Sequence, residues 1–329
     1  MSREDIIKRF GKILAEHGPL LSTEYDRLDI PDKPSRRLLF AHCGSWQNAV
    51  KEATQTCNLK LEPREVESSP HPEVLRLMQQ VEDLKKSLQT SKLHLHGTEF
   101  KFGVISDTHI GSLFCDYGLL DVAYETFAAR DVKIVLHAGD LLDGQKVYKG
   151  HDFEVETSGA DSQINLCVDR YPRHDGITTY FINGNHDRSF WKRSGIDVGP
   201  KITTKRPDIV YLGYQEEDIT LGDEPQNVVV RLFHPEGSGS AYALSYLAQR
   251  YVSELSNVNK PHLLIHGHTH KFNYMYYQNV FILQAGALQK QTPFMRGRKL
   301  ASHQGFSIVD LVVTKKGVAS MKVEFFPCY

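Results

Sequence analysis

The sequence predicts an α/β protein built as a four-layer α/β/β/α sandwich, with a small all-α module in front of it. Two observations predict the sandwich. Apolar, β-branched runs alternate with helical patterns from residue 98 onward, and the chain beyond residue 270 is rich in further strands. With 329 residues, of which 40% are hydrophobic, the chain is long enough for one large α/β domain and a small additional one.

Residues 1–62 are typical of a small helical module. Apolar residues between Ile6 and Leu14 recur at helical spacing, and Gly18-Pro19 ends that helix. Three further short helices are expected, at residues 22–28, after the capping residue Ser35, and at residues 47–54. The module has too few apolar residues to form a large domain.

Residues 63–97 predict a linker followed by a long helix. Prolines and mixed charge up to residue 72 are typical of a linker. From residue 72 to residue 91, apolar residues at helical spacing predict an amphipathic helix with charges on its other face. This helix could pack on the following domain, act as a spacer, or pair with a second copy of the chain to form an oligomer.

Residues 98–329 contain the elements of the sandwich. Strands are predicted where a short apolar, β-branched run ends at a turn, namely at 102–105, 132–136, 177–182, 228–233, 263–265, 272–277, 280–283, 306–313 and 321–326. Helices are predicted at 117–130, 162–171 and 241–255. Tyr274, Tyr276 and Tyr277 are interpreted as packing residues of one strand, with base stacking as the alternative.

Five short segments at the ends of predicted strands carry metal-binding side chains. They are D-T-H at 107–109, G-D at 139–140, G-N-H-D at 184–187, F-H at 233–234 and G-H-T-H at 267–270. In open α/β sheets, ligands gather where strands end. Oxygen and imidazole nitrogen donors without a competing cysteine suit hard or borderline divalent ions. A carboxylate such as Asp140 can bridge two ions roughly 3.5–4 Å apart, which is the spacing used in displacement at phosphorus.

The order of these motifs resembles that of the calcineurin-like metallophosphoesterases, over roughly residues 100–326. The resemblance implies two metal sites with Asp140 between them. Asp107, His109 and His270 are the expected ligands of the first ion. Asn185, His234 and His268 are the expected ligands of the second. Mn²⁺ is the expected metal, with Fe²⁺, Zn²⁺ and Ni²⁺ as alternatives.

The same resemblance implies a catalytic role for His186 and Asp143. His186 corresponds to the histidine that is not a metal ligand, contacts the phosphate and protonates the leaving oxygen. Asp143, the second acid of G-D-L-L-D, resembles the carboxylate that pairs with this histidine. Such a pair would fix the tautomer of His186 and favour its protonated form.

Other histidines are interpreted differently. His137 and His266 alternate within strand patterns and are expected to be buried, supporting the ligands without binding a metal. His303 has no clear pattern and could reach the site. His234 lies in a loop with glycine and serine, which leaves room for a phosphate to approach.

Departures from one branch of the superfamily narrow the substrate. The serine/threonine phosphoprotein phosphatases carry Arg-Gly after G-D-x-x-D and end the third motif with Glu. This chain has Gly144 after Asp143 and Asp187 after His186. It therefore does not resemble a phosphoprotein phosphatase, and its G-N-H-D motif is closer to double-strand-break repair nucleases and to assorted phosphodiesterases.

Residues 18–60 resemble the homing-endonuclease-associated repeat, a small DNA-binding helical unit. The resemblance rests on Pro19-Leu20-Leu21-Ser22, on Pro34-Ser35-Arg36-Arg37, and on Gly44-Ser45-Trp46 with a following alanine. It implies that DNA is a partner. The candidates for phosphate contacts are Lys33, Arg36, Arg37, Lys51 and Lys60. Trp46 is expected to be a core residue of the module, with a stacking surface as the alternative.

Composition sets further bounds. The net charge of −1 excludes a global basic field, so DNA contacts must come from a local patch. The charged start and the absence of any run of roughly 20 apolar residues predict no membrane partner and a cytoplasmic protein of prokaryotic or phage type. Five cysteines without C-x-x-C spacing predict free thiols and no zinc ribbon.

Three function hypotheses follow. The leading one is a dinuclear metal-dependent phosphodiesterase, a DNA nuclease whose N-terminal module binds the substrate. The second is a phosphatase or cyclic-nucleotide phosphodiesterase acting on a small phosphoester, with the module as a tether. The third is a binding protein with a relic site, against which the complete ligand set and His186 argue.

Overall fold

The computed structural model describes residues 2–61, 93–223, 227–237, 243–257 and 259–328. The chain divides into two units, Met1–Lys86 and Ser87–Tyr329. The linker predicted at residues 63–72 and the amphipathic helix predicted at residues 72–91 both lie outside the described residues. No helix among the described residues is both long and apolar enough to cross a membrane.

Four short helices make up the described part of the N-terminal unit: α1 (Arg3–His17), α2 (Ser22–Arg27), α3 (Arg36–Cys43) and α4 (Trp46–Thr56). Three of them begin at serine caps, because the hydroxyls of Ser2, Ser35 and Ser45 each accept a hydrogen bond from a backbone N–H of the first turn.

An aromatic cluster fills the core of this unit. The rings of Phe10, Tyr25 and Trp46 lie 5.1–5.2 Å apart, and the indole N–H donates to the carbonyl of Leu20 at 3.0 Å. The indole of Trp46 therefore makes both its aromatic contacts and its N–H hydrogen bond inside the unit. The prediction that Trp46 is a core residue is confirmed.

The second unit contains two six-stranded sheets. Across the first sheet the order is β12 (Gly317–Pro327), β11 (Gly305–Thr314), β2 (Glu99–Ile105), β3 (Ile134–His137), β4 (Thr178–Asn183) and β5 (Ile209–Tyr214). Across the second the order is β1 (Leu93–Leu95), β6 (Glu216–Leu221), β7 (Val228–Phe233), β8 (Leu263–His266), β10 (Val280–Gln284) and β9 (Asn273–Tyr277). Strands β2 to β5 run parallel, as do β7, β8 and β10.

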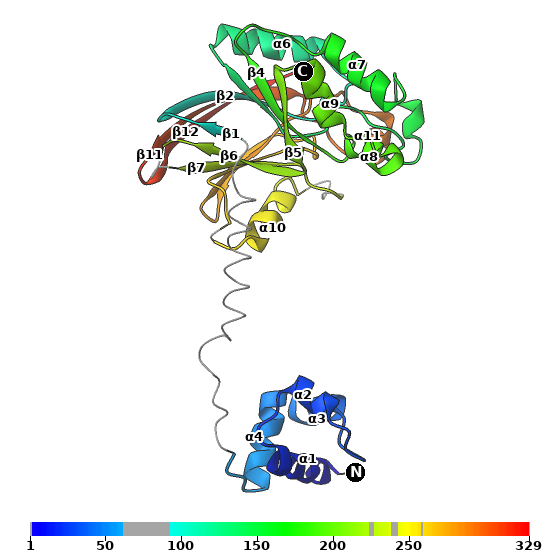
Figure 1. The fold of residues 1–329 in the computed structure, drawn as a ribbon, viewed down its shortest axis with the longest axis vertical. Coiled ribbons are helices and arrows are strands. Elements are labelled where there is room, and N and C mark those ends of the chain that lie inside the picture. Colours follow the sequence, from blue (N-terminus) through cyan, green and yellow to red (C-terminus); the bar gives the residue numbers. More distant parts are fainter. Residues whose placement is uncertain (1, 62–92, 224–226, 238–242, 258, 329) are drawn as a thin grey trace. The chain divides into compact units, whose positions relative to one another are not determined.

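Helices cover the outer faces of both sheets (Figure 1). The described helices are α6 (Tyr117–Ala129), α7 (Ala160–Arg170), α8 (Arg188–Ser194), α9 (Val198–Lys205), α10 (Tyr246–Glu254), α11 (Pro293–Gly297) and a 3₁₀ turn at His151–Phe153. Figure 1 shows α6, α7 and α9 above the first sheet and α10 below the second.

Three apolar cores separate these layers. One joins α6 and α7 to the first sheet, the second lies between the two sheets, and the third joins the second sheet to α10. Strand β8 shows how the alternation arises, since Leu263 and Ile265 face the inner core while Leu264 faces α10. The predicted α/β/β/α sandwich is confirmed.

Some elements differ from the prediction. The strands β1, β5 and β6 and the helices α8, α9 and α11 are present without having been predicted. Helix α10 begins at Tyr246, five residues after the predicted start, and residues 241–242 lie outside the described part. All five cysteines are free, as expected.

Candidate metal centre

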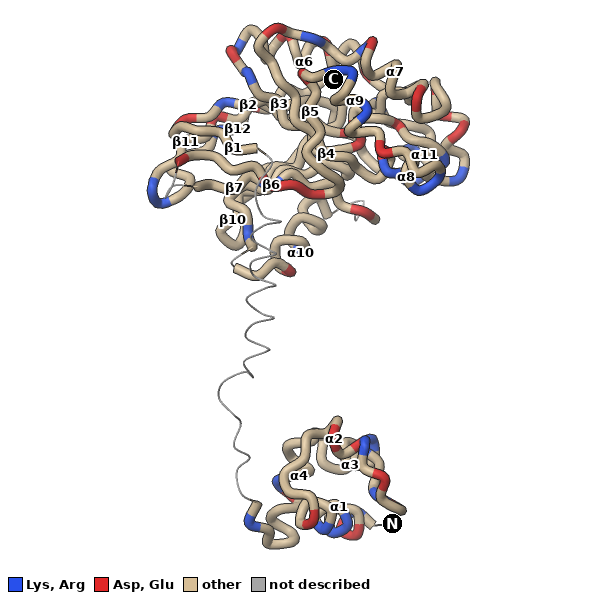
Figure 2. Tube along the Cα trace, viewed as in Figure 1, with Lys and Arg blue, Asp and Glu red and all other residues tan. Residues whose placement is uncertain are grey.

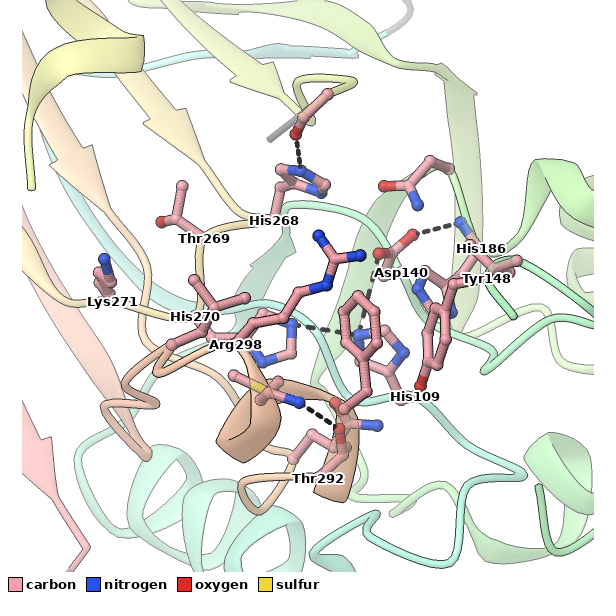
Figure 3. Close-up of a pocket in the computed structure, with 17 residues that line it drawn as sticks. His109, Asp140, Tyr148, His186, His268, Thr269, His270, Lys271, Thr292 and Arg298 are labelled. Carbon is pink, nitrogen blue, oxygen red and sulfur yellow. Dashed lines mark hydrogen bonds and ion pairs between the residues drawn. The ribbon is translucent and has the colours of Figure 1, made fainter. Parts of the chain in front are cut away.

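The parallel strands bring the seven predicted ligands to one edge of the sandwich. Asp107 follows β2, Asp140 follows β3, Asn185 follows β4, His234 follows β7, and His268 and His270 follow β8. His109 lies two residues beyond Asp107. Figure 3 shows Asp140, His109 and His270 directed toward the same cavity.

The backbone is strained at this edge. Five of the seven residues have positive φ, which side chains other than glycine rarely adopt: Asp107 (52°), His109 (46°), Asp140 (54°), His268 (74°) and His270 (54°). Each such residue costs about 1–3 kcal/mol and persists only where surrounding structure enforces it. Because these five residues lie close together, we infer that the surrounding structure holds their loops in conformations that direct the side chains toward one another.

Close packing of backbone on side chains explains the glycines of the motifs. A Cβ atom at Gly184 would collide with the carboxylate of Asp140, and one at Gly139 would collide with the ring of His234. The His186 backbone N–H donates to Asp140 Oδ1 at 2.8 Å, and that of His268 donates to Asp107 Oδ2 at 2.9 Å. The two carboxylates are thereby held in place by the neighbouring motifs.

The first group of donors contains Asp107, His109 and His270. The Nε2 atoms of the two histidines face each other at 3.3 Å, and His270 Nε2 lies 3.2 Å from Asp107 Oδ1. His109 Nε2 is 3.8 Å from a carboxylate oxygen of both Asp107 and Asp140. Two imidazole nitrogens and carboxylate oxygens converging on one point form a suitable set for a divalent cation.

The second group contains Asp140, His234 and His268. His234 Nδ1 donates to the Ala138 carbonyl at 2.7 Å, so in the neutral ring Nε2 is unprotonated, 3.0 Å from Asp140 Oδ2. His268 Nε2 donates to the Gly237 carbonyl at 2.6 Å, a bond that a metal at this nitrogen would replace.

Asn185 adds an oxygen to the second group. Its Oδ1 atom is buried and has no hydrogen-bond partner among the described residues. A buried oxygen without a partner is costly unless a ligand satisfies it. The donors of both groups therefore fit divalent cations.

Electrostatics point the same way. Burial alone would raise the pKa of Asp107, but His270 and His109 outweigh burial and hold this pKa well below its usual range. Burial would lower the pKa of His109, yet Asp107 and Asp143 raise it to about 10. The pKa of His234 rises to about 9 against burial, chiefly because of Asp140. The buried carboxylates thus stabilise positive charge next to them, and divalent ions would supply such charge.

The expected pairing of Asp143 with His186 takes a different form. His186 Nδ1 lies 2.5 Å from the backbone carbonyl of Asp143 and 3.8 Å from its carboxylate. A carbonyl only accepts, so Nδ1 carries a proton and the tautomer is fixed as predicted, although by the backbone. Burial lowers the pKa of His186 to about 4 despite the charge of Asp140. Contrary to the expectation from the sequence, the protonated form of His186 is therefore not favoured.

The carboxylate of Asp143 instead joins two other histidines. Its Oδ1 accepts from His109 Nδ1 at 3.2 Å, and its Oδ2 accepts from His151 Nε2 at 3.1 Å. His151 is buried, and its Nδ1 accepts from the Val147 N–H, which fixes its tautomer. The sequence carries no pattern that would have identified His151.

Asp187 connects the second and third motifs. Its buried carboxylate accepts hydrogen bonds from the backbone N–H groups of Leu141, Leu142 and Gly184 at 2.8–3.2 Å. Burial, together with the charge of Asp140, raises its pKa to about 7. Asp187, the last residue of G-N-H-D, therefore joins the loops that contain the second and third motifs.

Three other histidines that the sequence analysis considered, His137, His266 and His303, do not line the cavity. His137 and His266 are buried, as predicted, and His137 contacts Thr108 Oγ1 at 3.1 Å. His303 does not line the cavity, because its Nδ1 accepts from the backbone N–H of Phe272 at 3.1 Å.

A cavity of about 610 Å³ opens beside both groups. Besides His109, Asp140, Asn185, His186, His268 and His270, it is lined by side chains that no sequence pattern marks, among them Tyr148, Lys271, Phe294 and Arg298. Figure 3 shows Tyr148 next to His186 and Arg298 reaching toward the Asp140 side. In Figure 2, lysine and arginine gather at α8 and α11, where Lys192, Arg193 and Arg296 lie.

The chain is similar to known proteins. A family model for the calcineurin-like phosphoesterase superfamily domain matches residues 100–308. The chain is 24% identical over 271 residues to the DNA polymerase II small subunit of Archaeoglobus fulgidus, covering 69% of this chain and 54% of that protein. It is 25% identical over 230 residues to the DNA polymerase II small subunit of Halobacterium salinarum, covering 58% of this chain and 44% of that protein. The chain therefore spans about half the length of the curated relatives it matches.

Solved structures are also similar to part of the chain. An archaeal phosphodiesterase is 15% identical with a TM-score of 0.37, covering 69% of this chain and 100% of the other. A phosphoesterase of E. coli is 14% identical with a TM-score of 0.36, covering 68% of this chain and 98% of the other.

Proposed function

The chain belongs to the calcineurin-like phosphoesterase superfamily, and from this membership we propose that it is a dinuclear metal-dependent phosphodiesterase that cleaves DNA. The observation that carries the proposal is the convergence of two donor groups on one cavity with Asp140 between them. We assign Asp107, His109 and His270 to one ion and Asn185, His234 and His268 to the other. When bound, such ions supply the positive charge that activates a water molecule and neutralises phosphoryl oxygens.

His186 is proposed as the general acid. Its Nδ1 is committed to the Asp143 carbonyl, so Nε2 is the nitrogen that can carry a proton to the leaving oxygen. Burial lowers the pKa of this ring to about 4. The negative charge of a bound phosphodiester next to the ring would raise the pKa and favour the imidazolium form.

Asp143 is proposed as a positioning residue. By accepting from His109 Nδ1, its carboxylate directs the unprotonated Nε2 of this histidine toward the first ion. The role of Asp143 toward His186 is limited to its backbone carbonyl.

DNA is the proposed substrate. The relatives' name, DNA polymerase II small subunit, associates them with DNA, and the basic side chains at α8 and α11 could hold a phosphate backbone. Residues 1–62 are proposed as a DNA-binding module and residues 98–329 as the catalytic domain. The predicted connection, residues 63–97, ends earlier than expected, because β1 (Leu93–Leu95) pairs with β6 and so belongs to the catalytic domain.

Three of the predicted phosphate-binding residues of the module remain candidates. Arg37, Lys51 and Lys60 are exposed. Arg36 forms an ion pair with Asp26 at 3.1 Å. The Lys33 ammonium donates to backbone carbonyls in the last turn of α2, those of Tyr25 at 2.8 Å and Asp26 at 3.1 Å, and so has a structural role.

The alternative is an enzyme for a small phosphoester, with the N-terminal module as a tether. A cavity of about 610 Å³ favours it, because this volume is typical of small-ligand pockets.

One set of substrates distinguishes the nuclease proposal from the small-phosphoester alternative. The purified chain with added Mn²⁺ is given bis-p-nitrophenyl phosphate, p-nitrophenyl phosphate, and labelled single- and double-stranded DNA. Cleavage of the diester and of DNA that is abolished by Asp140→Ala is the expected result. Turnover of the monoester alone would contradict the nuclease proposal and favour the alternative.

A further inference from the structure

A column of stacked side chains forms one wall of the cavity. The rings of Tyr148 and Phe294 are stacked with centroids 3.9 Å apart and planes inclined by 21°. The guanidinium carbon of Arg298 lies 4.9 Å from the Phe294 ring centroid, on the cavity lining. At the other end, the Tyr148 ring is 6.3 Å from the ring of His186. The column therefore begins next to the proposed general acid.

A buried carboxylate holds the column together. Glu154 Oε2 accepts from the Tyr148 hydroxyl at 2.6 Å, and its Oε1 accepts from the Phe294 backbone N–H at 2.9 Å. Glu154 is only 7% exposed. This clamp joins the loop that carries Tyr148 to the start of α11, although the two segments are far apart in the sequence.

The loop that carries Tyr148 is itself anchored. The Gln145 N–H donates to Ser189 Oγ at 2.8 Å, and the Arg193 guanidinium donates to the carbonyls of Gln145 and Lys146 at 3.0 and 2.7 Å. The Val147 N–H is bound by His151. The wall is thus a preformed surface that a ligand would meet with little rearrangement.

The end of the column is chemically suited to a nucleobase. Arg298 is exposed and has no carboxylate partner among the described residues, so its planar guanidinium is available at the cavity. Bases stack on guanidinium planes and aromatic rings irrespective of sequence, and a positive charge beside such a surface attracts the sugar-phosphate backbone. A phosphoester without a base has no group that would stack on such a wall, whereas a nucleotide or a nucleic-acid strand has one.

We infer that Tyr148, Phe294 and Arg298 form a base-stacking subsite, which receives an unpaired base beside the scissile phosphate, so that the enzyme acts on single-stranded DNA. This inference rests on the proposed function, because the site of cleavage defines which nucleotide reaches the column. A cavity of about 610 Å³ accommodates roughly one or two nucleotides and not a duplex.

The test uses the full chain and single-stranded oligonucleotides that carry the fluorescent base 2-aminopurine at the 5′ end in one probe and at the 3′ end in another. An abasic end replaces the base in a matched pair of probes. Arg298→Ala and Phe294→Leu are compared with Arg296→Ala, a change of an exposed arginine on the same helix that does not line the cavity. Binding is measured with His186→Ala added in every variant to slow cleavage.

The expected result is quenching of one of the two fluorescent probes, which Arg298→Ala and Phe294→Leu remove and Arg296→Ala preserves. With these two variants KM for the base-bearing strand, measured with His186 intact, should rise about tenfold, and KM for the abasic strand should change less than twofold. Since Arg298 is exposed, its replacement tests the idea without endangering the fold.

Other outcomes overturn the inference. Quenching that survives both substitutions, no quenching of either probe, equal losses on base-bearing and abasic strands, or equal quenching of a base paired within a duplex would each contradict a stacking subsite for unpaired bases. Quenching of the expected kind in a chain that hydrolyses no diester would retain the subsite and refute the proposed function. Diester cleavage without quenching would retain the proposed function and refute the subsite.

Discussion

The carboxylate of Asp143 lies 3.2 Å from Nδ1 of His109, although the motif that contains it points to a pairing with His186. This contact leaves Nε2 of His109 as the unprotonated nitrogen in the neutral ring and directs it toward Asp107. The other carboxylate oxygen is bound by His151, so the orientation of a proposed ligand depends on a chain of buried groups.

Replacing Asp143 by Asn should weaken metal binding. His109 and His151 contact different oxygens of Asp143. Asn would place an NH2 group, which cannot accept, at one of these two positions, so the support that orients His109 would be weakened. We expect the Mn²⁺ dissociation constant to rise about 10- to 100-fold, measured by isothermal titration calorimetry. Asp152→Asn, a change of an exposed neighbouring acid, is the matched control and should leave the constant unchanged. An unaltered Mn²⁺ affinity in Asp143→Asn would contradict the positioning role.

His186→Ala should separate catalysis from metal binding. Since His186 is proposed as an acid and not as a ligand, we expect hydrolysis of bis-p-nitrophenyl phosphate to fall by roughly 10² to 10⁴ while the bound metal stays constant. Metal content is measured by mass spectrometry of the desalted protein. The side chain lies close enough to His109 and Asp140 to bind an ion with them, so a loss of metal would reassign it as a ligand.

The seven proposed ligands could be selected from the sequence because each lies in a short motif directly after an apolar strand, and the structure brings them to one edge of the sandwich. Local patterns of this kind do not depend on distant parts of the chain. The column of Tyr148, Phe294 and Arg298 could not be predicted in the same way. It is assembled by tertiary contacts between the loop that carries Tyr148 and the short helix α11, and neither segment has a periodic pattern.

The missed strand β6 has a similar explanation. It begins with acidic residues, which are unusual in a strand. In the sheet, Asp218 lies opposite Arg231 of β7, and its carboxylate accepts from the guanidinium at 2.6 Å. A cross-strand ion pair therefore replaces the apolar alternation that marks the other strands.

His268→Ala should remove one of the two proposed ions. His268 belongs to the second donor group, whereas the first group does not include it. We expect the Mn²⁺ stoichiometry to drop from about two to about one per chain. His303→Ala changes a histidine that does not line the cavity and serves as the control. If His268→Ala still bound two ions, the proposed ligand set of the second site would be wrong.

Changes in the N-terminal module should alter the salt dependence of DNA binding. Arg37 and Lys51 are exposed and remain candidates for phosphate contacts. In the full chain, Arg37→Ala combined with Lys51→Ala should lower the slope of log K against log salt by about 2, because each lost phosphate contact lowers it by about 1. Lys12→Ala, an exposed change on α1, is the comparison. Identical slopes for the double variant and for Lys12→Ala would exclude Arg37 and Lys51 from the DNA contact.

The most direct test of a dinuclear centre is the anomalous diffraction signal of Mn²⁺ in crystals of the full chain. We predict two peaks on either side of Asp140, one in contact with Asp107, His109 and His270 and one in contact with Asn185, His234 and His268. A single peak, or a peak held by Asp143, His151 and His186, would contradict the proposed centre and with it the proposed mechanism of hydrolysis.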